Sequence, residues 1–103
     1  MRFLVLSKMN TPIPPDLALP LFDAMERFMD SMLKSGKAEQ FFSLAGYIGG
    51  GAILNVESHE ELDTVVSQFP YGPFSTSEVY ALGDLSHSLA ESKKVTQQMS
   101  AQR

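Results

Sequence analysis

Residues 40–56 read QFFSLAGYIGGGAILNV, and this stretch decides the fold class. It contains two runs rich in strand-forming residues, 40–45 and 52–56, on either side of the glycine-rich segment 46–51. Two such runs separated by glycine are typical of antiparallel strands joined in a hairpin. We therefore expect a β-hairpin near the middle of the chain.

A helix is predicted on each side of this hairpin. Apolar residues recur at steps of three and four through 21–33, with charged residues between them, and Gly36 can adopt the left-handed conformation that ends helices. This helix is expected to begin either at Asp16 as a cap or at Leu19, with Pro20 in its first position. After the hairpin, Ser58 and Glu61 have the spacing of a capping box, followed by a second apolar helical face.

Two further strands, 2–8 and 77–82, complete the order β-α-β-β-α-β. This order predicts an α+β protein of the ferredoxin-like type, in which a four-stranded antiparallel sheet carries both helices on one face. We expect residues 1–83 to form this domain and residues 84–103 to form a C-terminal helical extension or tail.

The strand period of two divides the sheet residues between its faces. If Phe3, Val5, Leu54, Val56 and Val79 face the helices, the opposite face carries Leu4, Leu6, Ile53, Asn55, Glu78, Tyr80 and Leu82. Covering apolar surface contributes about 25 cal/mol per Å², and monomers rarely leave a large apolar patch in water. We therefore expect a second copy to cover this face, in a homodimer or a larger homo-oligomer.

Composition and charge exclude several classes of protein. The 103 residues include 8 basic and 12 acidic side chains, a net charge of -4, without a basic cluster that could bind a phosphate backbone, so no nucleic-acid partner is expected. There is no cysteine, which excludes disulfides and thiolate sites and agrees with a reducing compartment. No apolar run approaches the roughly 20 residues of a membrane helix, and no signal-peptide pattern follows Met1. We expect a cytoplasmic protein without membrane association.

Neither a metal nor a cofactor site is predicted. His59 and His87 lack carboxylates at the spacing of metal ligands, and each is expected to be a surface histidine. The glycines at 49–51 suggest a phosphate loop, but they are expected between two strands and no Lys-Ser/Thr pair follows them. They are interpreted as a hairpin tip.

Residues from Phe3 to about Leu82 resemble the muconolactone isomerase family without a gap. The most specific matches are Ser35-Gly36-Lys37, Ala45-Gly46, Val56-Glu57-Ser58, Glu61-Leu62, Pro70, Pro73, Glu78-Val79 and Leu82. The resemblance implies a dimeric α+β barrel in which sheets pack across a dimer. It also implies an isomerase that moves a double bond in a small lactone or carbonyl compound by abstracting and returning a proton.

The resemblance also suggests site residues. Where the family carries basic side chains, this chain has Leu4, Leu6 and Phe22, so the substrate is expected to be less charged than the family's own lactone. Glu78 matches in position and type and would shuttle the proton. Tyr80, two residues away on the same face, and Asn55 would orient oxygen atoms. The expected walls of the substrate site are Leu4, Leu6, Phe41 and Ile53.

Other interpretations remain open. Glu78 could instead pair with a charge on the next subunit. The chain could be a non-catalytic homo-oligomeric module that binds a small molecule, or a cofactor-free oxygenase or cyclase with the same barrel architecture. The residues 84–103 either fray or dock on a neighbour.

Overall fold

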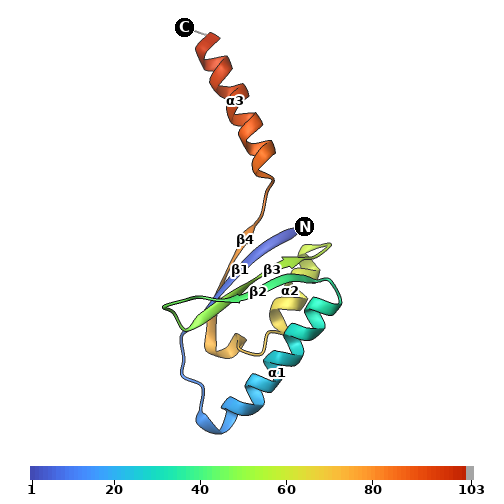
Figure 1. The fold of residues 1–103 in the computed structure, drawn as a ribbon, viewed down its shortest axis with the longest axis vertical. Coiled ribbons are helices and arrows are strands. Elements are labelled where there is room, and N and C mark those ends of the chain that lie inside the picture. The colour runs from blue at the N-terminus through green and yellow to red at the C-terminus, as the bar shows by residue number, and fades with distance from the viewer. Residues whose placement is uncertain (102–103) are drawn as a thin grey trace.

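The computed structural model describes residues 1–101. Its four strands form one antiparallel sheet in the order β2-β3-β1-β4. The elements follow the predicted order, including a helix in the predicted C-terminal extension, and a short 3-10 helix occurs in addition (Figure 1). Their bounds are β1 Arg2–Met9, α1 Pro15–Lys34, β2 Ala38–Ser43, β3 Gly49–Asn55, α2 His59–Ser67, η1 Gly72–Phe74, β4 Ser75–Ala81 and α3 Leu85–Ala101. The predicted ferredoxin-like fold is confirmed.

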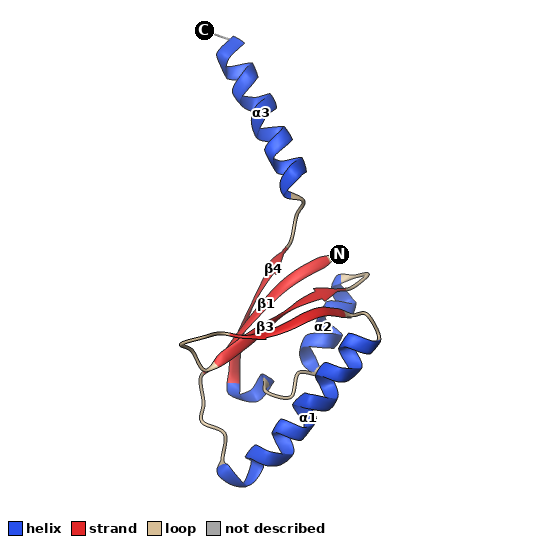
Figure 2. Cartoon of the chain, in the orientation of Figure 1, coloured by secondary structure: helices blue, strands red, loops and turns tan. Residues whose placement is uncertain are grey.

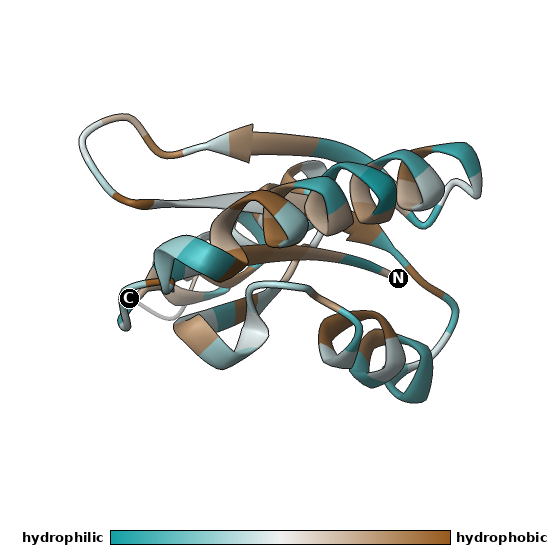
Figure 3. Cartoon of the chain, turned by 90° about the horizontal axis from the view of Figure 1, so that it is seen from below, coloured by the Kyte–Doolittle hydropathy of each residue, from teal (hydrophilic) through white to brown (hydrophobic). Residues whose placement is uncertain are grey.

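Helices α1 and α2 cover one face of the sheet and leave the other face open (Figure 2). Teal and brown alternate along α1, as expected for a helix that packs one apolar side on a sheet (Figure 3). The core lies between the sheet and the helices, where eight apolar side chains are buried: Phe3, Val5, Met32, Ala38, Ala52, Leu54, Val56 and Val65.

The division of β1 between two faces is confirmed by the pairing of the strands. Phe3 and Val5 pair with Leu54 and Ala52 and are buried under the helices. Leu4 pairs with Ile53 on one side and Tyr80 on the other, so these three form a row across the opposite face. We call this uncovered side of the sheet the open face, which carries Leu4, Leu6, Ile53, Asn55, Glu78, Tyr80 and Leu82.

The hairpin differs from the prediction at its glycines. Gly49, Gly50 and Gly51 belong to β3, and the connection between the strands is formed by residues 44–48. A β-carbon on Gly49 would lie 2.2 Å from the Ser7 carbonyl oxygen, and one on Gly50 would lie 2.5 Å from the Phe42 carbonyl oxygen. The glycines therefore allow neighbouring backbones to approach, and the interpretation as a hairpin tip is wrong.

Helix α1 begins at Pro15, earlier than either predicted start. Pro14 is the cap residue, and its carbonyl oxygen accepts a hydrogen bond from Leu17 N at 2.9 Å. Proline is suited to the first helical position because its missing N–H has no partner there in any case. Pro20 lies inside the helix, one turn further on.

The predicted cap of α2 by Ser58 is confirmed, and the second bond of the box goes to Glu57 N, one residue before the cap. Glu61 N donates to Ser58 Oγ at 3.0 Å, while Glu61 Oε2 accepts from Glu57 N at 3.1 Å. The side chains of Ser58 and Glu61 thus satisfy two backbone donors at the beginning of the helix.

Helix α3 stands away from the rest of the molecule, beyond the end of β4 (Figure 1). Every residue of Leu85–Ala101 is exposed, including Leu85, Leu89, Val95 and Met99. Asp84 fixes the start of the helix, because its Oδ1 accepts from Ser86 N at 2.9 Å. Within residues 1–101, no helix combines the length and the apolar character needed to cross a membrane.

Candidate functional site

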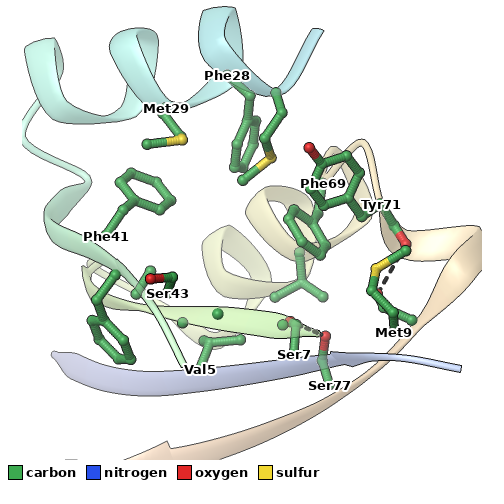
Figure 4. A pocket seen from close by; sticks show the side chains of 18 of the residues that line it. Val5, Ser7, Met9, Phe28, Met29, Phe41, Ser43, Phe69, Tyr71 and Ser77 are labelled. Atoms are coloured by element: carbon green, nitrogen blue, oxygen red, sulfur yellow. Dashed lines mark hydrogen bonds between the residues drawn. The ribbon is translucent and has the colours of Figure 1, made fainter. Parts of the chain in front are cut away.

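A pocket of about 600 Å³ lies between the sheet and the two helices, which we call the layer pocket. Its floor is the helix-facing side of β1, β2 and β3, and its roof comes from α1 and α2 (Figure 4). The apolar residues of its walls are Val5, Met9, Ile13, Phe22, Met25, Phe28, Met29, Phe41, Phe42, Ile48, Ala52, Leu54, Val65, Val66 and Phe69. Gly49, Gly50 and Gly51 also line the pocket, and Gly50, the partner of Ser7 and Ser43, leaves a helix-facing position of the floor without a side chain.

The polar groups of the layer pocket gather mainly along one line of the sheet. Ser43, Gly50, Ser7 and Ser77 are successive partners across β2, β3, β1 and β4, and we call this line the serine row. Ser7 is buried, and its Oγ lies 2.7 Å from Ser77 Oγ (Figure 4). This pair provides hydroxyl donors and acceptors in an otherwise apolar space.

Tyr71 is the one ionisable residue among the described residues that line the layer pocket. Burial, with a smaller contribution from the negative charge of Glu26, raises the pKa of Tyr71. The phenol is therefore neutral at physiological pH and can donate a hydrogen bond. The described lining contains no carboxylate or imidazole that could act as a general base near neutral pH.

The predicted proton shuttle lies on the open face, on the other side of the sheet. Tyr80 Oη donates a hydrogen bond to Glu78 Oε2, and the neighbouring partners on β1 are Leu4 and Leu6. This hydrogen bond, followed by the negative charge of Glu78 and by burial, raises the pKa of Tyr80. Sequence reasoning therefore placed Glu78 and Tyr80 together correctly, beside an apolar surface. Both side chains are exposed in the single chain.

Asn55 lies apart from this pair. It is the partner of Arg2, whereas Glu78 is the partner of Leu6, two strands and four residues away. At about 3.3 Å per residue and 4.8 Å per strand, this separation is roughly 16 Å. One small molecule cannot contact Asn55 and Glu78 of the same chain.

Phe41 faces the layer pocket, away from Leu4, Leu6 and Ile53. An irregularity between Ala38 and Gln40 shifts the register of β2, so Phe41 pairs with Ala52 on the helix-facing side. There its ring packs edge-on against Phe28, with 6.3 Å between the ring centroids. The four predicted walls therefore lie on two sides of the sheet, and Phe41 cannot join the other three in one site of this chain. Phe22 also lies on the helix side, at the layer pocket.

The two histidines lie neither in the layer pocket nor on the open face. His59 is exposed at the first turn of α2 and packs edge-on to Phe3, with 6.1 Å between the ring centroids. His87 is exposed on α3. Among residues 1–101, no three metal-binding side chains come together.

Among the described residues of β1, Arg2 and Lys8 lie on the same side as Leu4 and Leu6, and Lys8 Nζ lies 4.8 Å from the centroid of the Tyr47 ring. Arg2 donates to Glu39 Oε2 through Nε at 3.0 Å and through Nη2 at 2.8 Å. A guanidinium held in this way is less available to bind the carboxylate of a ligand.

Comparison with known proteins identifies the family. The model of the muconolactone delta-isomerase family matches residues 1–88. The chain belongs to this family. A muconolactone delta-isomerase from Acinetobacter baylyi is 29% identical over 84 residues, which cover 80% of this chain and 88% of the relative.

Solved structures share the fold. A muconolactone isomerase structure superposes with a TM-score of 0.75 at 23% identity, covering 82% of this chain and 90% of that chain. A 5-chloro-2-hydroxyhydroquinone dehydrochlorinase from Burkholderia phenoliruptrix, in complex with 2,5-dihydroxybenzoquinone, has a TM-score of 0.66 at 18% identity, covering 84% and 98%. The same fold thus occurs in proteins named for different reactions.

Proposed function

We propose that this chain is an isomerase that moves a proton, and with it a double bond, in a small uncharged lactone or carbonyl compound. The observation that carries this proposal is the hydrogen bond between Tyr80 and Glu78 beside the apolar residues of the open face. Membership of the muconolactone delta-isomerase family supports the reaction class. The proposed location is the cytoplasm.

The proposed site lies between the open faces of two copies in a homodimer. A second copy would remove Leu4, Leu6 and Ile53 from water, which is the main source of free energy for such an association. It would also desolvate Glu78 and so raise the proton affinity of its carboxylate toward the range useful for a general base. Asn55 can join such a site only from the second copy.

In the proposed reaction, Glu78 abstracts a proton from the carbon next to the carbonyl group. The electrons move into the ring to give an enolate, whose oxygen accepts a hydrogen bond from a neutral phenol or amide such as Tyr80 or Asn55. The same carboxyl group returns the proton at the far end of the conjugated system, and the double bond is shifted. The substrate is uncharged because Leu4 and Leu6 offer no cation for a carboxylate.

The test compares two lactones and three variants. The probes are α-angelica lactone, a neutral butenolide, and muconolactone, which carries a carboxylate, both followed by NMR in D₂O for double-bond shift and deuterium uptake. We expect the neutral lactone to be preferred. Glu78→Gln should lower kcat by about 10²-fold or more, since general bases contribute factors of about 10² to 10⁴. Tyr80→Phe should lower kcat by about tenfold.

The matched control is Asp23→Asn, which removes an exposed carboxylate on α1 and should leave turnover unchanged. Turnover in Glu78→Gln equal to that of the unaltered chain would remove Glu78 from the mechanism. Proton exchange no faster than in buffer, for both lactones, would contradict the isomerase proposal.

A non-catalytic binding module is the second candidate. It is favoured by the layer pocket, which offers space for a ligand but no carboxylate or imidazole among its described lining residues. Binding of a small molecule without turnover, insensitive to Glu78→Gln, would support this candidate.

A further inference from the structure

Helix α3 carries an apolar stripe that nothing covers in the single chain (Figure 1). Its large apolar side chains are between 52% and 79% exposed: Leu85, Leu89, Val95 and Met99. At about 100° per residue, these four lie within an arc of roughly 120° on one side of the helix, which we call the α3 stripe. The charged side chains of α3 lie outside this arc: Glu91, Lys93 and Lys94. A partner can therefore cover the α3 stripe without burying a charge.

The sequence of α3 is a weak helix former by itself. Serine, threonine, valine and histidine recur between Leu85 and Ala101, and each has a lower helix propensity than alanine or leucine. Its local supports include the Asp84 cap and an exposed ion pair between Lys94 Nζ and Glu91 Oε1 at 3.2 Å, and exposed pairs contribute little. Most of the stability of such a helix comes from packing its apolar face. We therefore expect α3 to pack against another surface.

The α3 stripe is symmetric along the helix. Leu85 and Met99 lie seven residues on either side of Ser92, and Leu89 and Val95 lie three residues on either side. Two antiparallel copies related by a two-fold axis at Ser92 therefore place Leu85 of one copy level with Met99 of the other. They also place Leu89 level with Val95. A surface that binds its own copy has to be self-complementary in this way. The symmetry points to a second α3 as the partner of the stripe.

Small residues occupy the middle of the α3 stripe. Ser92 is its centre, with Ser88 and Thr96 about one turn away on either side. Ser92 Oγ donates to the Ser88 carbonyl oxygen at 3.0 Å, so this hydroxyl already has a partner within the helix. An apolar surface can cover Ser92 without leaving an unpaired donor. Small side chains at the contact also let two helix backbones approach closely.

The antiparallel orientation follows from the size of the rest of the molecule. Only Leu82, Gly83 and Asp84 separate α3 from β4, and packed helices lie about 8–10 Å apart. The two smaller extents of the molecule are 29 and 21 Å. In a parallel pair, two domains of this width would compete for space at the same end of the helices. An antiparallel pair places them at opposite ends and sets the two helix dipoles in opposite directions.

We infer that the α3 stripe binds the α3 stripe of a second copy, in an antiparallel pair about a two-fold axis at Ser92. A single pair of helices of this length buries less than the roughly 800 Å² per partner of a standard interface, so the contact is weak by itself. Together with the proposed homodimer through the open faces, it links homodimers into a larger assembly. The helix pair itself depends neither on the open face nor on the Glu78 reaction.

The experiment introduces single cysteines into the full chain, which has none of its own. Ser92→Cys places a thiol at the two-fold axis, where an antiparallel pair brings the two β-carbons toward the separation of about 3.5–4.5 Å that a disulfide needs. Under mild oxidation at high micromolar concentration, we expect a disulfide-linked dimer on non-reducing gels. It should form at least tenfold faster than in Ala90→Cys, the matched control, because Ala90 is exposed on the opposite side of α3.

Mixed variants determine the orientation of the pair. A mixture of Leu85→Cys and Met99→Cys should give a mixed disulfide dimer, identified by its intact mass. Leu85→Cys alone should form a dimer at least tenfold more slowly, because the two thiols of an antiparallel pair lie about 21 Å apart along the helices. A Leu85→Cys dimer that forms as fast as the mixed dimer would overturn the antiparallel pair.

Two double variants distinguish the α3 stripe from the open face. Ser92→Cys/Leu89→Lys places a charge in the stripe and should form the disulfide at least tenfold more slowly than Ser92→Cys. Ser92→Cys/Leu4→Lys changes the open face and should still react at least tenfold faster than Ala90→Cys/Leu4→Lys. Circular dichroism checks that each variant folds.

Three further outcomes would overturn the inference. They are equal rates for Ser92→Cys and Ala90→Cys, an unchanged rate in folded Ser92→Cys/Leu89→Lys, and loss of the disulfide in folded Ser92→Cys/Leu4→Lys, which would place the stripe against the open face. Because none of these measurements involves turnover, they fail or succeed separately from the test of Glu78.

Discussion

At the scale of single residues, the hydrogen bond between Tyr80 and Glu78 couples the ionisation of two side chains. A carboxylate that accepts from a phenol favours the protonated phenol, so the pKa of Tyr80 lies above its ordinary value of 10.0. The stabilisation from this bond is fully present below pH 10.0 and is lost as the pH rises through the raised pKa. Tyr80 is thus a dependable donor at neutral pH.

This coupling predicts a change in titration. In Glu78→Gln, the titration midpoint of Tyr80 should fall toward its ordinary value, because the negative acceptor is gone. The midpoint of Tyr71, which burial and Glu26 raise, should stay where it is. Carbon NMR of the labelled tyrosine rings, assigned with Tyr80→Phe, measures both. An unchanged Tyr80 midpoint would contradict the hydrogen bond.

At the scale of elements, the contribution of the α2 cap to the stability of the fold can be measured. Removing the Ser58 hydroxyl leaves Glu61 N without its acceptor. Ser58→Ala should therefore lower the free energy of unfolding by about 1 kcal/mol, which corresponds to a fall in Tm of roughly 4–8 °C for a domain of this size. Thermal denaturation followed by circular dichroism tests this value, with Ser100→Ala on exposed α3 as the control.

Helix α3 gives a second prediction at this scale. Its residues are exposed and it stands away from the sheet, so a chain that ends at Gly83 should fold with its Tm within about 2 °C of the full chain. Matching near-ultraviolet circular dichroism would show that residues 1–83 form a domain. A fall of 10 °C or more would show that α3 supports the fold.

The order of elements and the faces of β1 could be predicted from the sequence because periodicity records which side of each element is buried. The side on which Phe41 lies could not be predicted, because the irregularity after Ala38 exchanges the face of the sheet on which each following residue of β2 lies. The prediction for Gly49–Gly51 was wrong for a related reason. Glycine is typical of turns, but here it is required because backbone atoms that are distant in sequence lie too close for a β-carbon.

The candidate site was predictable only in part. Glu78 and Tyr80 could be predicted as neighbours because residues two apart on a strand lie on the same face of the sheet. The layer pocket was missed because a space between side chains depends on how α1 and α2 pack. Ser7, a polar residue at a helix-facing position of β1, was the signal that could have indicated it.

At the scale of the whole molecule, the open face predicts self-association. Sedimentation at micromolar concentration should give a particle of at least twice the chain mass of 11.3 kDa. Leu4→Lys should weaken the association by about tenfold or more, because it places a charge between Ile53 and Tyr80 in the middle of the apolar row. Lys93→Gln, on exposed α3, is the control. A monomer under these conditions would contradict the homodimer.

The three residues Leu82, Gly83 and Asp84 join α3 to β4, and a β-carbon at Gly83 would meet nothing within 4 Å. A helix of this length at 1.5 Å per residue extends for about 25 Å, so a rotation of about 20° at this joint sweeps its far end through roughly 9 Å. Small backbone changes at this joint thus produce large displacements at the far end of the helix. The direction of α3 relative to the sheet depends on the backbone angles of these three residues.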